Sequence, residues 1–443
     1  MNLGEKVFCP RNPRPEHGLG IEGSVEGFLL HVAAAGAPSG FLPLFSHWLL
    51  RRALARVPAL EDGRAARPTP PRQPRLNATP LGISAIAVHQ PSWELDNAWF
   101  GEAMPRKFSH HTGIEARAIS LDDEVTMGIA AVRKLQRETG CNLADCRGIV
   151  FVSPSFIPAS VAQQHLDAAG ADRERPGRAA REVVRELGLT RCRSIGINWF
   201  CCGYSRAFSL VGRRWAPRLG IHRDEFLLVV AATRISRITD YSSPQTAGLF
   251  GDMASATLLA PTTSRKYPVH FEIVHANAEK QPAVRSTFDF HVRPQVPVPT
   301  PGGGTAHADK RLVYTLDGMA IAEIAPRAMS AATAKALADV GLSGGDVSFV
   351  VPHQAGSGIV RFTGMQLDGY GVGGELVNGL TRRTGNVSAC SIPHALKDTW
   401  GRLRGLIACP TAAVGSPGRP EVLQGCILLR ATPFHERQAN AAA

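Results

Sequence analysis

Three reactive side chains stand in short segments where the chain turns after an apolar or β-prone stretch. Cys201 lies in the run NWFCCGYSR, His353 in VPHQA and Asn386 in RTGNVSA. A cysteine thiolate is a nucleophile toward a thioester carbonyl. A neutral imidazole and a carboxamide can both donate hydrogen bonds to a developing enolate oxygen. Together, the three residue types predict thioester chemistry.

The predicted positions of these residues suit that chemistry. Cys201 follows a strand expected over residues 194–198 and opens a helix, whose dipole would lower the pKa of the thiol and leave a thiolate near neutral pH. His353 follows a strand expected over residues 347–351, at the edge where ligands gather in α/β sheets. This strand could be the counterpart of the strand before Cys201. Taken singly, each residue could instead be structural, as a buried cysteine, a core histidine or a turn asparagine.

Strand and helix patterns alternate from residue 81 onward, which is typical of a doubly wound α/β protein. In the first part, we expect strands over residues 82–88, 148–152, 194–198 and 226–232 and helices over 126–137 and 180–187. In the second part, we expect a helix over 318–340 and strands over 347–351 and 425–430. Prolines and a run of three glycines predict a connector or irregular insertion between them. The predicted organisation is an N-terminal extension, partly disordered, over 1–80, a first half over 81–262, the connector over 263–310 and a second half over 311–443.

The composition favours a soluble protein with an acidic partner. The 443 residues carry a formal charge of +12, with 44% hydrophobic and 19% charged residues, which is a soluble globular composition. The positive charge favours a phosphate-bearing cofactor, a nucleic acid or an acidic carrier protein. No basic run with interleaved aromatic residues appears, so we expect no nucleic-acid binding.

The cysteines and an uncharged segment near the N terminus indicate the cellular compartment and whether the chain enters a membrane. The nine cysteines are odd in number and scattered, and no secretion signal precedes them, which indicates a reducing cytoplasm. Their spacing matches no metal site, so we expect no metal. Residues 28–50 lack charged side chains, but histidine, proline and glycine residues interrupt them. We therefore expect no membrane insertion.

Five segments together resemble one known family. They are HTGIE at residues 111–115, CCGY at 201–204, GLFGDMASA at 248–256, VPHQA at 351–355 and GNVSA at 385–389. In their order and approximate spacing they are similar to the β-ketoacyl-ACP synthase III-like condensing enzymes of the thiolase superfamily. The resemblance implies a thiolase-like α/β fold, with two similar α/β halves in a layered α-β-α-β-α arrangement. It also implies a homodimer.

The resemblance further implies a role for each site residue. Cys201, rather than Cys202, would take an acyl group from a CoA or carrier-protein thioester. His353 and Asn386 would hydrogen-bond a malonyl-type thioester while it loses CO2, and backbone N–H groups of Cys201 and Gly425 would hold the oxyanion. No cofactor is implied, because CoA or phosphopantetheine thioesters enter as substrates.

Departures from the family pattern bear on substrate recognition. His111 replaces the usual arginine, Lys107 stands where a CoA-stacking tryptophan is often found, and Gly356 replaces an asparagine. We assign Lys107 and His111 as substrate or carrier contacts. Arg213 and Arg214 form a basic cluster that would suit an acidic acyl carrier protein, although such runs are commonly solvated surface.

The sequence thus predicts a cytoplasmic, homodimeric acyltransferase that extends an acyl thioester by decarboxylative condensation, in fatty-acid or specialised polyketide-type biosynthesis. Two alternatives stay open. One keeps the acyl-Cys201 intermediate but transfers the acyl group to an alcohol, an amine or a second acyl thioester without decarboxylation. The other is a non-catalytic partner subunit of a condensing enzyme.

Overall fold

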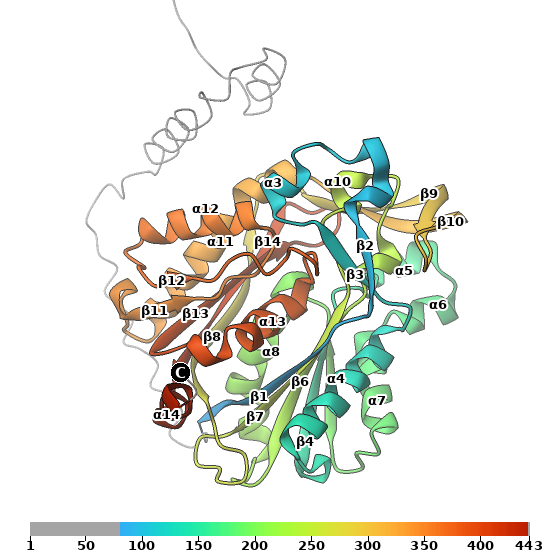
Figure 1. Ribbon diagram of the computed structural model, residues 1–443. Helices are drawn as coiled ribbons and strands as arrows, with labels where there is room; N and C mark the ends of the chain where they lie inside the picture. The colour runs from blue at the N-terminus through green and yellow to red at the C-terminus, as the bar shows by residue number, and fades with distance from the viewer. Residues whose placement is uncertain (1–79, 442–443) are drawn as a thin grey trace, which may run out of the picture. The chain divides into compact units, whose positions relative to one another are not determined.

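A computed structural model describes residues 80–441 (Figure 1). The predicted N-terminal extension therefore lies outside the described residues, except for Pro80. In the described part of the chain, no helix is both long enough and apolar enough to cross a membrane.

The fold is organised around one sheet of ten strands in the order β12-β11-β13-β14-β8-β1-β7-β6-β4-β5. The first five in chain order are β1 (Leu81–His89), β4 (Cys146–Val152), β5 (Arg193–Ile197), β6 (Phe226–Thr233) and β7 (Met253–Pro261). The others are β8 (Phe271–Pro282), β11 (Val347–Val350), β12 (Glu375–Leu376), β13 (Leu406–Val414) and β14 (Glu421–Ala431).

The two halves of this sheet repeat the same pairing pattern. In the first, β4 pairs in parallel with β5 and β6, and β7 then pairs antiparallel with β6 and β1. In the second, β11 pairs in parallel with β12 and β13, and β14 then pairs antiparallel with β13 and β8. The halves are joined between β1 and β8, where Gly82 lies opposite Glu272 and Ile83 opposite Phe271. The prediction of two similar halves is confirmed.

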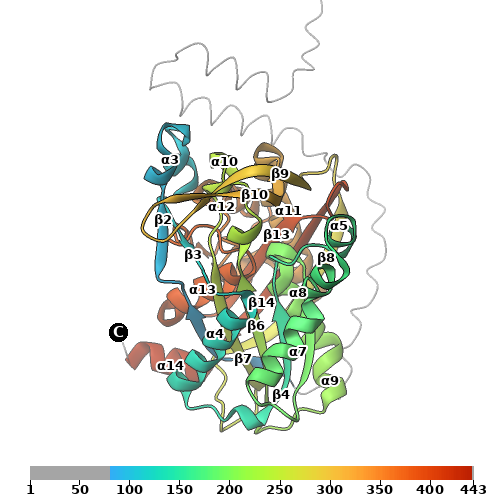
Figure 2. The same ribbon diagram turned by 90° about the vertical axis from the view of Figure 1, so that its right-hand side faces the viewer.

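The helices form three layers, as Figures 1 and 2 show: one on the outer face of each half of the sheet and one between the two halves. Helices α4 (Glu124–Thr139) and α7 (Pro176–Glu186) pack on the outer face of the first half, and α11 (Gly318–Asp339) and α12 (Ser357–Asp368) on that of the second. Between the halves lie α8 (Gly203–Leu210) and α13 (Ser391–Asp398), whose Phe208 and Leu396 share one core with Val229 and Ile427. The predicted α-β-α-β-α arrangement is therefore confirmed.

Shorter elements complete the described chain. The strands are β2 (Trp93–Asp96) and β3 (Ala116–Ile119), which pair with each other, and the helices are α3 (Phe108–Thr112), α5 (Ala159–His165), α6 (Ala168–Arg173), α9 (Ala216–Leu219), α10 (Pro244–Ala247) and α14 (Pro433–Ala441). The single turns used below are η3 (Phe200–Cys202), the π-helical η4 (Val211–Trp215) and η7 (Ser388–Cys390).

The local patterns explain why the main elements form where they do. All eight residues of β6 are buried, as expected for an apolar strand covered on both faces. The carboxylate of Asp123 caps α4 at its start by accepting a hydrogen bond from the Thr126 N–H, and Gly140 ends the helix in the left-handed conformation. The strands and helices expected from the sequence all occur, although the closing strand begins at Glu421 rather than Gly425.

The segment over residues 263–310 is not an irregular connector, and this prediction is wrong. It contains β8, which lies inside the sheet, and most of a hairpin of β9 (Phe288–Pro299) and β10 (Thr305–Leu316). The prolines of β9 misled the prediction because β9 pairs with β10 alone, and an edge strand tolerates residues that lack an N–H donor. At the base of the hairpin, Phe288, Phe290 and Tyr314 are buried.

Candidate active site

The nucleophile candidate sits in a strained turn between β5 and α8. The carboxamide NH2 of Asn198 anchors the turn by donating to the carbonyl of Phe156 at 2.6 Å. Phe200 then adopts a φ of 43°, a conformation that L-residues rarely occupy and that marks stored backbone strain. Cys201 follows within η3, one turn before α8. This turn places the Cys201 side chain at the N-terminal end of α8.

The second half contains a matching turn before α13. Ser388 opens η7 with a φ of 48°, and in the described residues only Phe200, Gln295 and Ser388 are non-glycine residues with positive φ. By sheet position, β12 corresponds to β5 and α13 to α8, because β12 and β5 are the two edge strands of the sheet and pair in parallel with the equivalent strands β11 and β4. The strand before His353 is β11, the counterpart of β4. The prediction that it matches the strand before Cys201 is therefore wrong.

The turn at Asn386 is held by elements of the first half. The Asn386 N–H donates to the Leu249 carbonyl at 2.8 Å, and the Gly251 N–H donates to the Asn386 carbonyl at 3.1 Å. The Thr233 hydroxyl donates to the Val387 carbonyl at 3.0 Å. A side chain on Gly251 would meet the Thr384 carbonyl oxygen at 1.9 Å. The segment over residues 248–256 thus fixes the position of the asparagine through backbone contacts.

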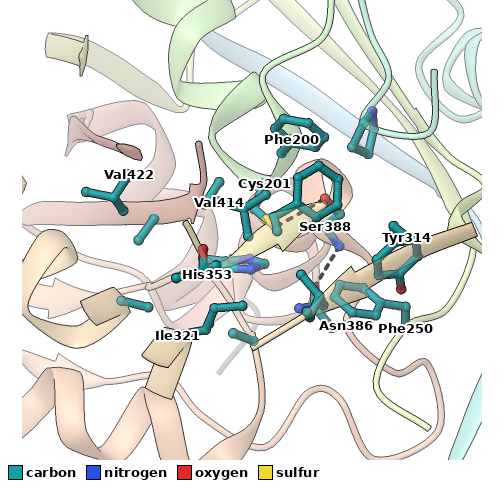
Figure 3. Close-up of a pocket in the computed structure, with 18 of the residues that line it drawn as sticks. Phe200, Cys201, Phe250, Tyr314, Ile321, His353, Asn386, Ser388, Val414 and Val422 are labelled. Carbon is teal, nitrogen blue, oxygen red and sulfur yellow. Dashed lines mark hydrogen bonds between the residues drawn. The ribbon is translucent and has the colours of Figure 1, made fainter. Parts of the chain in front are cut away.

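Cys201, His353 and Asn386 line a single cavity, shown in Figure 3. The cavity encloses about 820 Å³ of space free of atoms, part of it open to solvent. Most of its remaining lining is apolar: Phe200, Ile235, Ile238, Phe250, Phe288, Tyr314, Leu316, Ile321, Ile324, Val414 and Val422. Glu421 is the one carboxylate among the lining residues of this cavity, and it pairs with Lys280 at 3.1 Å. The apolar character of this lining suits an acyl chain.

The thiol of Cys201 is neutral in this site. Burial raises its pKa to about 11, and a hydrogen bond from the Ser388 hydroxyl, at 3.2 Å between Oγ and Sγ, acts in the opposite direction. The expectation of a thiolate near neutral pH is therefore wrong. Desolvation opposes a charged sulfur here, because the apolar cavity removes water from around it.

His353 is also neutral and tightly held. It is 2% exposed, and burial lowers its pKa to about 4. Its backbone N–H donates to the Pro410 carbonyl at 2.9 Å, and its Nδ1 is buried without a hydrogen-bond partner in the described chain. The neighbouring Gln354 donates its side-chain NH2 to the carbonyls of Pro352 and Val377, both at 3.0 Å. As a neutral imidazole, His353 carries one N–H, which it can donate to a bound molecule from Nε2.

The orientation of the Asn386 carboxamide is set by a backbone contact. Its Oδ1 accepts a hydrogen bond from the Ser388 N–H at 2.8 Å, and the side chain lines the cavity beside His353 (Figure 3). Because the oxygen is already occupied, the NH2 group is the end left to donate to a ligand. Asn386 and His353 can thus act as paired donors to one substrate oxygen.

Gly425 does not take part in the cavity, which corrects its predicted role at the oxyanion. It lies inside β14, opposite Thr411 of β13 and Ala278 of β8, and it does not line the cavity. A Cβ at this position would come within 3.0 Å of the Ser205 side chain of α8 and 2.7 Å of the Asn277 carbonyl. The glycine therefore serves the close approach of α8 to the sheet.

The four predicted contact residues also lie outside the cavity lining. Lys107 and His111 are exposed at α3, where burial and the neighbouring charges of His110, Lys107 and Arg361 lower the pKa of His111. Arg213 and Arg214 are exposed on η4. That turn follows α8, on the far side of that helix from Cys201 in the chain. Their proposed contacts with substrate or carrier stay predictions.

Cys202 is buried and does not line the cavity. It is fully buried and packs against Ala413 and Leu423. Burial raises the pKa of the Cys202 thiol well above that of Cys201. Only Cys201 of this adjacent pair lines the cavity.

Sequence reasoning missed two groups of cavity residues. Ser388 contacts the thiol directly, and its signal was its place two residues after Asn386 in the segment already singled out. Phe288 and Tyr314 come from the hairpin that was predicted to be a connector. Alternating apolar residues over 288–292 and the apolar run over 312–314 could have revealed those strands.

Comparison with solved structures defines the class of fold. The chain superposes on 3-oxoacyl-[acyl-carrier-protein] synthase III from Aquifex aeolicus VF5 with a TM-score of 0.58 and 19% identity, over 79% of this chain and 99% of that one. It superposes equally on the priming β-ketosynthase of the R1128 polyketide biosynthetic pathway, with a TM-score of 0.58 and 20% identity, over 80% and 98% of the two chains. The fold is therefore that of the thiolase-type condensing enzymes.

Sequence comparison points to the same family. The family model for 3-oxoacyl-[acyl-carrier-protein (ACP)] synthase III matches residues 221–278. The β-ketoacyl-[acyl-carrier-protein] synthase III of Geobacillus kaustophilus is 27% identical over 64% of this chain and 77% of its own, and that of Rhodobacter capsulatus is 27% identical over 79% and 98%. The predicted resemblance to the β-ketoacyl-ACP synthase III-like condensing enzymes is confirmed.

Proposed function

We propose that the protein is a condensing enzyme that extends an acyl thioester by decarboxylative Claisen condensation, in fatty-acid or polyketide-type biosynthesis. The observation that carries this proposal is the meeting of Cys201, His353 and Asn386 on one apolar cavity, although 185 residues separate Cys201 from Asn386. The cavity supplies a nucleophile, two neutral donors and space for an acyl chain.

In the first half-reaction, the Cys201 sulfur attacks the carbonyl carbon of an acyl thioester. A new C–S bond forms, the bond to the CoA or phosphopantetheine sulfur breaks, and the released thiol leaves with the proton that Cys201 gives up. Because burial holds the pKa of Cys201 at about 11, loading depends on this proton transfer. The apolar lining then shields the acyl-enzyme from water.

In the second half-reaction, a malonyl-type thioester loses CO2 beside His353 and Asn386. The electron pair of the broken C–C bond passes to the thioester carbonyl, and the resulting enolate oxygen accepts hydrogen bonds from the imidazole N–H and the carboxamide NH2. The enolate carbon attacks the acyl carbonyl on Cys201. Collapse of the tetrahedral intermediate breaks the C–S bond and returns the sulfur, which takes up a proton.

The neutral state of His353 fits this role. Its pKa of about 4 keeps the ring uncharged at physiological pH. A neutral donor stabilises an enolate without holding the carboxylate of the extender in an ion pair. This chemistry uses the chain's own groups and requires no cofactor beyond the thioester substrates.

We further propose that the enzyme is a cytoplasmic homodimer. The strand β5 is at one edge of the sheet, contains no proline and leaves Ile195 and Ile197 partly exposed. An edge strand of this kind can pair with a second copy. The eight cysteines of the described chain are free thiols, which suits a reducing compartment.

The proposed acyl donors are acyl-CoA and acyl carrier protein thioesters. The net charge of +12 favours either of these phosphate-bearing partners. The decisive experiment measures the intact mass of the protein after incubation with a panel of both, for the wild type, Cys201→Ala and Cys202→Ala. We expect an acyl adduct in the wild type and in Cys202→Ala, and none in Cys201→Ala.

A second measurement separates condensation from simple acyl transfer. The acylated protein is mixed with a malonyl thioester, and release of CO2 is followed together with formation of the β-ketoacyl product. Release of both in equal amounts supports condensation. Acyl transfer to an alcohol or amine without CO2 would favour the non-decarboxylative alternative, and failure of every thioester to load would favour a non-catalytic partner subunit.

A further inference from the structure

The contact between Ser388 and Cys201 joins the two halves of the molecule at the reacting sulfur. The Ser388 hydroxyl donates to the Cys201 sulfur at 3.2 Å, and the two residues are 187 positions apart in the chain. Ser388 is 1% exposed, so water cannot replace this donor freely. The hydroxyl is the one polar side-chain group of the described chain that hydrogen-bonds the thiol.

Ser388 also determines how Asn386 is presented. Its backbone N–H donates to the Asn386 Oδ1 at 2.8 Å, which turns the NH2 of that carboxamide away from the backbone. The side chain of Ser388 therefore contacts the proposed nucleophile, Cys201. Its backbone contacts Asn386, the proposed donor to the enolate. Figure 3 shows Ser388 between Cys201 and Asn386, with both hydrogen bonds drawn.

The backbone at Ser388 is strained in a way that supports a site role. Its φ of 48° is a left-handed conformation, which costs a residue with a Cβ free energy that surrounding contacts must offset. Those contacts include the Thr233 hydroxyl on the Val387 carbonyl and the Asn386 N–H on the Leu249 carbonyl. A glycine would relieve the strain, but it would remove the hydroxyl that reaches Cys201.

We infer that Ser388 is a positioning residue for the nucleophile: its hydroxyl aims the Cys201 sulfur and stabilises the thiolate during acyl loading, while its backbone N–H independently holds Asn386. A donated hydrogen bond strengthens when the acceptor becomes charged. The hydroxyl therefore favours the thiolate over the thiol in a cavity whose desolvation opposes charge. This inference rests on the proposed function for its consequence in catalysis, but its effect on the thiol can be measured alone.

The test uses the full-length protein and the variants Ser388→Ala and Ser388→Gly. Second-order rate constants for alkylation by iodoacetamide are measured at pH 8, 9 and 10. Peptide mass shows that the alkylated residue is Cys201. Loss of the hydroxyl should raise the pKa of Cys201 by about one unit, so that alkylation slows roughly tenfold at each pH. Both variants should agree, because both lack the hydroxyl although only glycine relieves the strained φ.

A matched control is Ser205→Ala. Ser205 is a buried serine of α8 whose hydroxyl pairs with that of Thr411 at 3.0 Å, and no hydrogen bond joins it to Cys201. Its alkylation profile should match the wild type. Decarboxylation of a malonyl thioester by the Ser388 variants should fall much less than alkylation does, because the backbone N–H that holds Asn386 is retained.

Two results would overturn the inference. One is an unchanged alkylation rate in folded Ser388→Ala and Ser388→Gly protein. The other is an equal loss of alkylation and decarboxylation, which would mean that Ser388 acts on the fold of the turn and not on the sulfur. Failure of the wild type to load any acyl thioester would instead count against the proposed function, since alkylation does not depend on acyl chemistry.

Discussion

The two halves of this protein share one strand order but carry different chemistry at equivalent turns. After β5, the first half places Phe200 in a strained conformation and presents Cys201 before α8. After β12, the second half places Ser388 in nearly the same conformation before α13, with Asn386 two residues earlier. The repeat brings two helix entrances to one cavity, with Cys201 at the first and Asn386 at the second, while His353 reaches the same cavity from the turn after β11.

This difference shows how the duplicated fold divides a reaction. In the proposed reaction, the first half supplies the sulfur that becomes acylated, and the second supplies His353 and Asn386 around the enolate. The turns nevertheless depend on each other, because Leu249 and Gly251 of the first half hold Asn386 by backbone hydrogen bonds. Each half thus builds part of the site that the other uses.

The largest expected effect tests whether the halves divide the two half-reactions. Cys201→Ala should abolish acyl loading but leave decarboxylation of a malonyl thioester near the wild-type rate, since both enolate donors remain. Loading is read from intact mass and decarboxylation from CO2 release. Loss of both activities in folded protein would show that the division between the halves does not hold.

The pH dependence of the thiol tests the first half alone. With a pKa of about 11, the thiolate fraction rises tenfold per pH unit below that value, so alkylation of Cys201 should accelerate by about 10³ between pH 7 and pH 10. Iodoacetamide labelling followed by peptide mass measures this rate. A plateau reached near pH 8 would indicate a thiolate that is stabilised by the helix entrance after all.

The reciprocal variants test the second half. His353→Ala and Asn386→Ala should each slow decarboxylation by about 10² to 10³, because each removes one donor to the enolate oxygen. Acyl loading of Cys201 should persist in both variants and is checked by intact mass. The His353 effect should be constant from pH 6 to pH 9, since burial lowers the pKa of the imidazole to about 4 and protonation occurs only below that range.

A substitution at Gly251 tests whether the turn at Asn386 in the second half depends on the first half. A Cβ there would lie 1.9 Å from the Thr384 carbonyl oxygen, so Gly251→Ala should lower the free energy of unfolding by about 3 kcal/mol and reduce decarboxylation. Gly212→Ala is the matched control, because no atom lies within 4 Å of its Cβ position. It should be neutral or add up to about 1 kcal/mol. Denaturant unfolding measures both, and equal stabilities would contradict the close approach.

The smallest expected effect concerns the surface behind the nucleophile helix. Arg213 and Arg214 are exposed, so replacing both by alanine should raise the KM for an acyl carrier protein substrate about threefold at low salt and less at high salt. kcat should not change, because neither residue lines the cavity. An unchanged KM would identify this cluster as solvated surface.

Much of the fold was accessible from the sequence because its signals are local. The buried run of β6 and the amphipathic pattern of α4 follow from residue types within one element. The hairpin of β9 and β10 was missed, since its prolines predict a loop unless it is known that β9 pairs on one side only. The predicted role of Gly425 at the oxyanion was also wrong, because the glycine is required by its neighbour Ser205, which comes from a helix distant in the chain.

The sequence by itself determined the kind of chemistry and the turns that carry it. Cys201 and His353 each follow a strand closely, and the residue types of Cys201, His353 and Asn386 predict a thiol nucleophile with two neutral donors. Only the tertiary structure decided that burial raises the pKa of Cys201 and that Ser388 reaches its sulfur. Desolvation and hydrogen bonds across the two halves depend on segments far apart in the chain, and local sequence patterns contain no information about such distances.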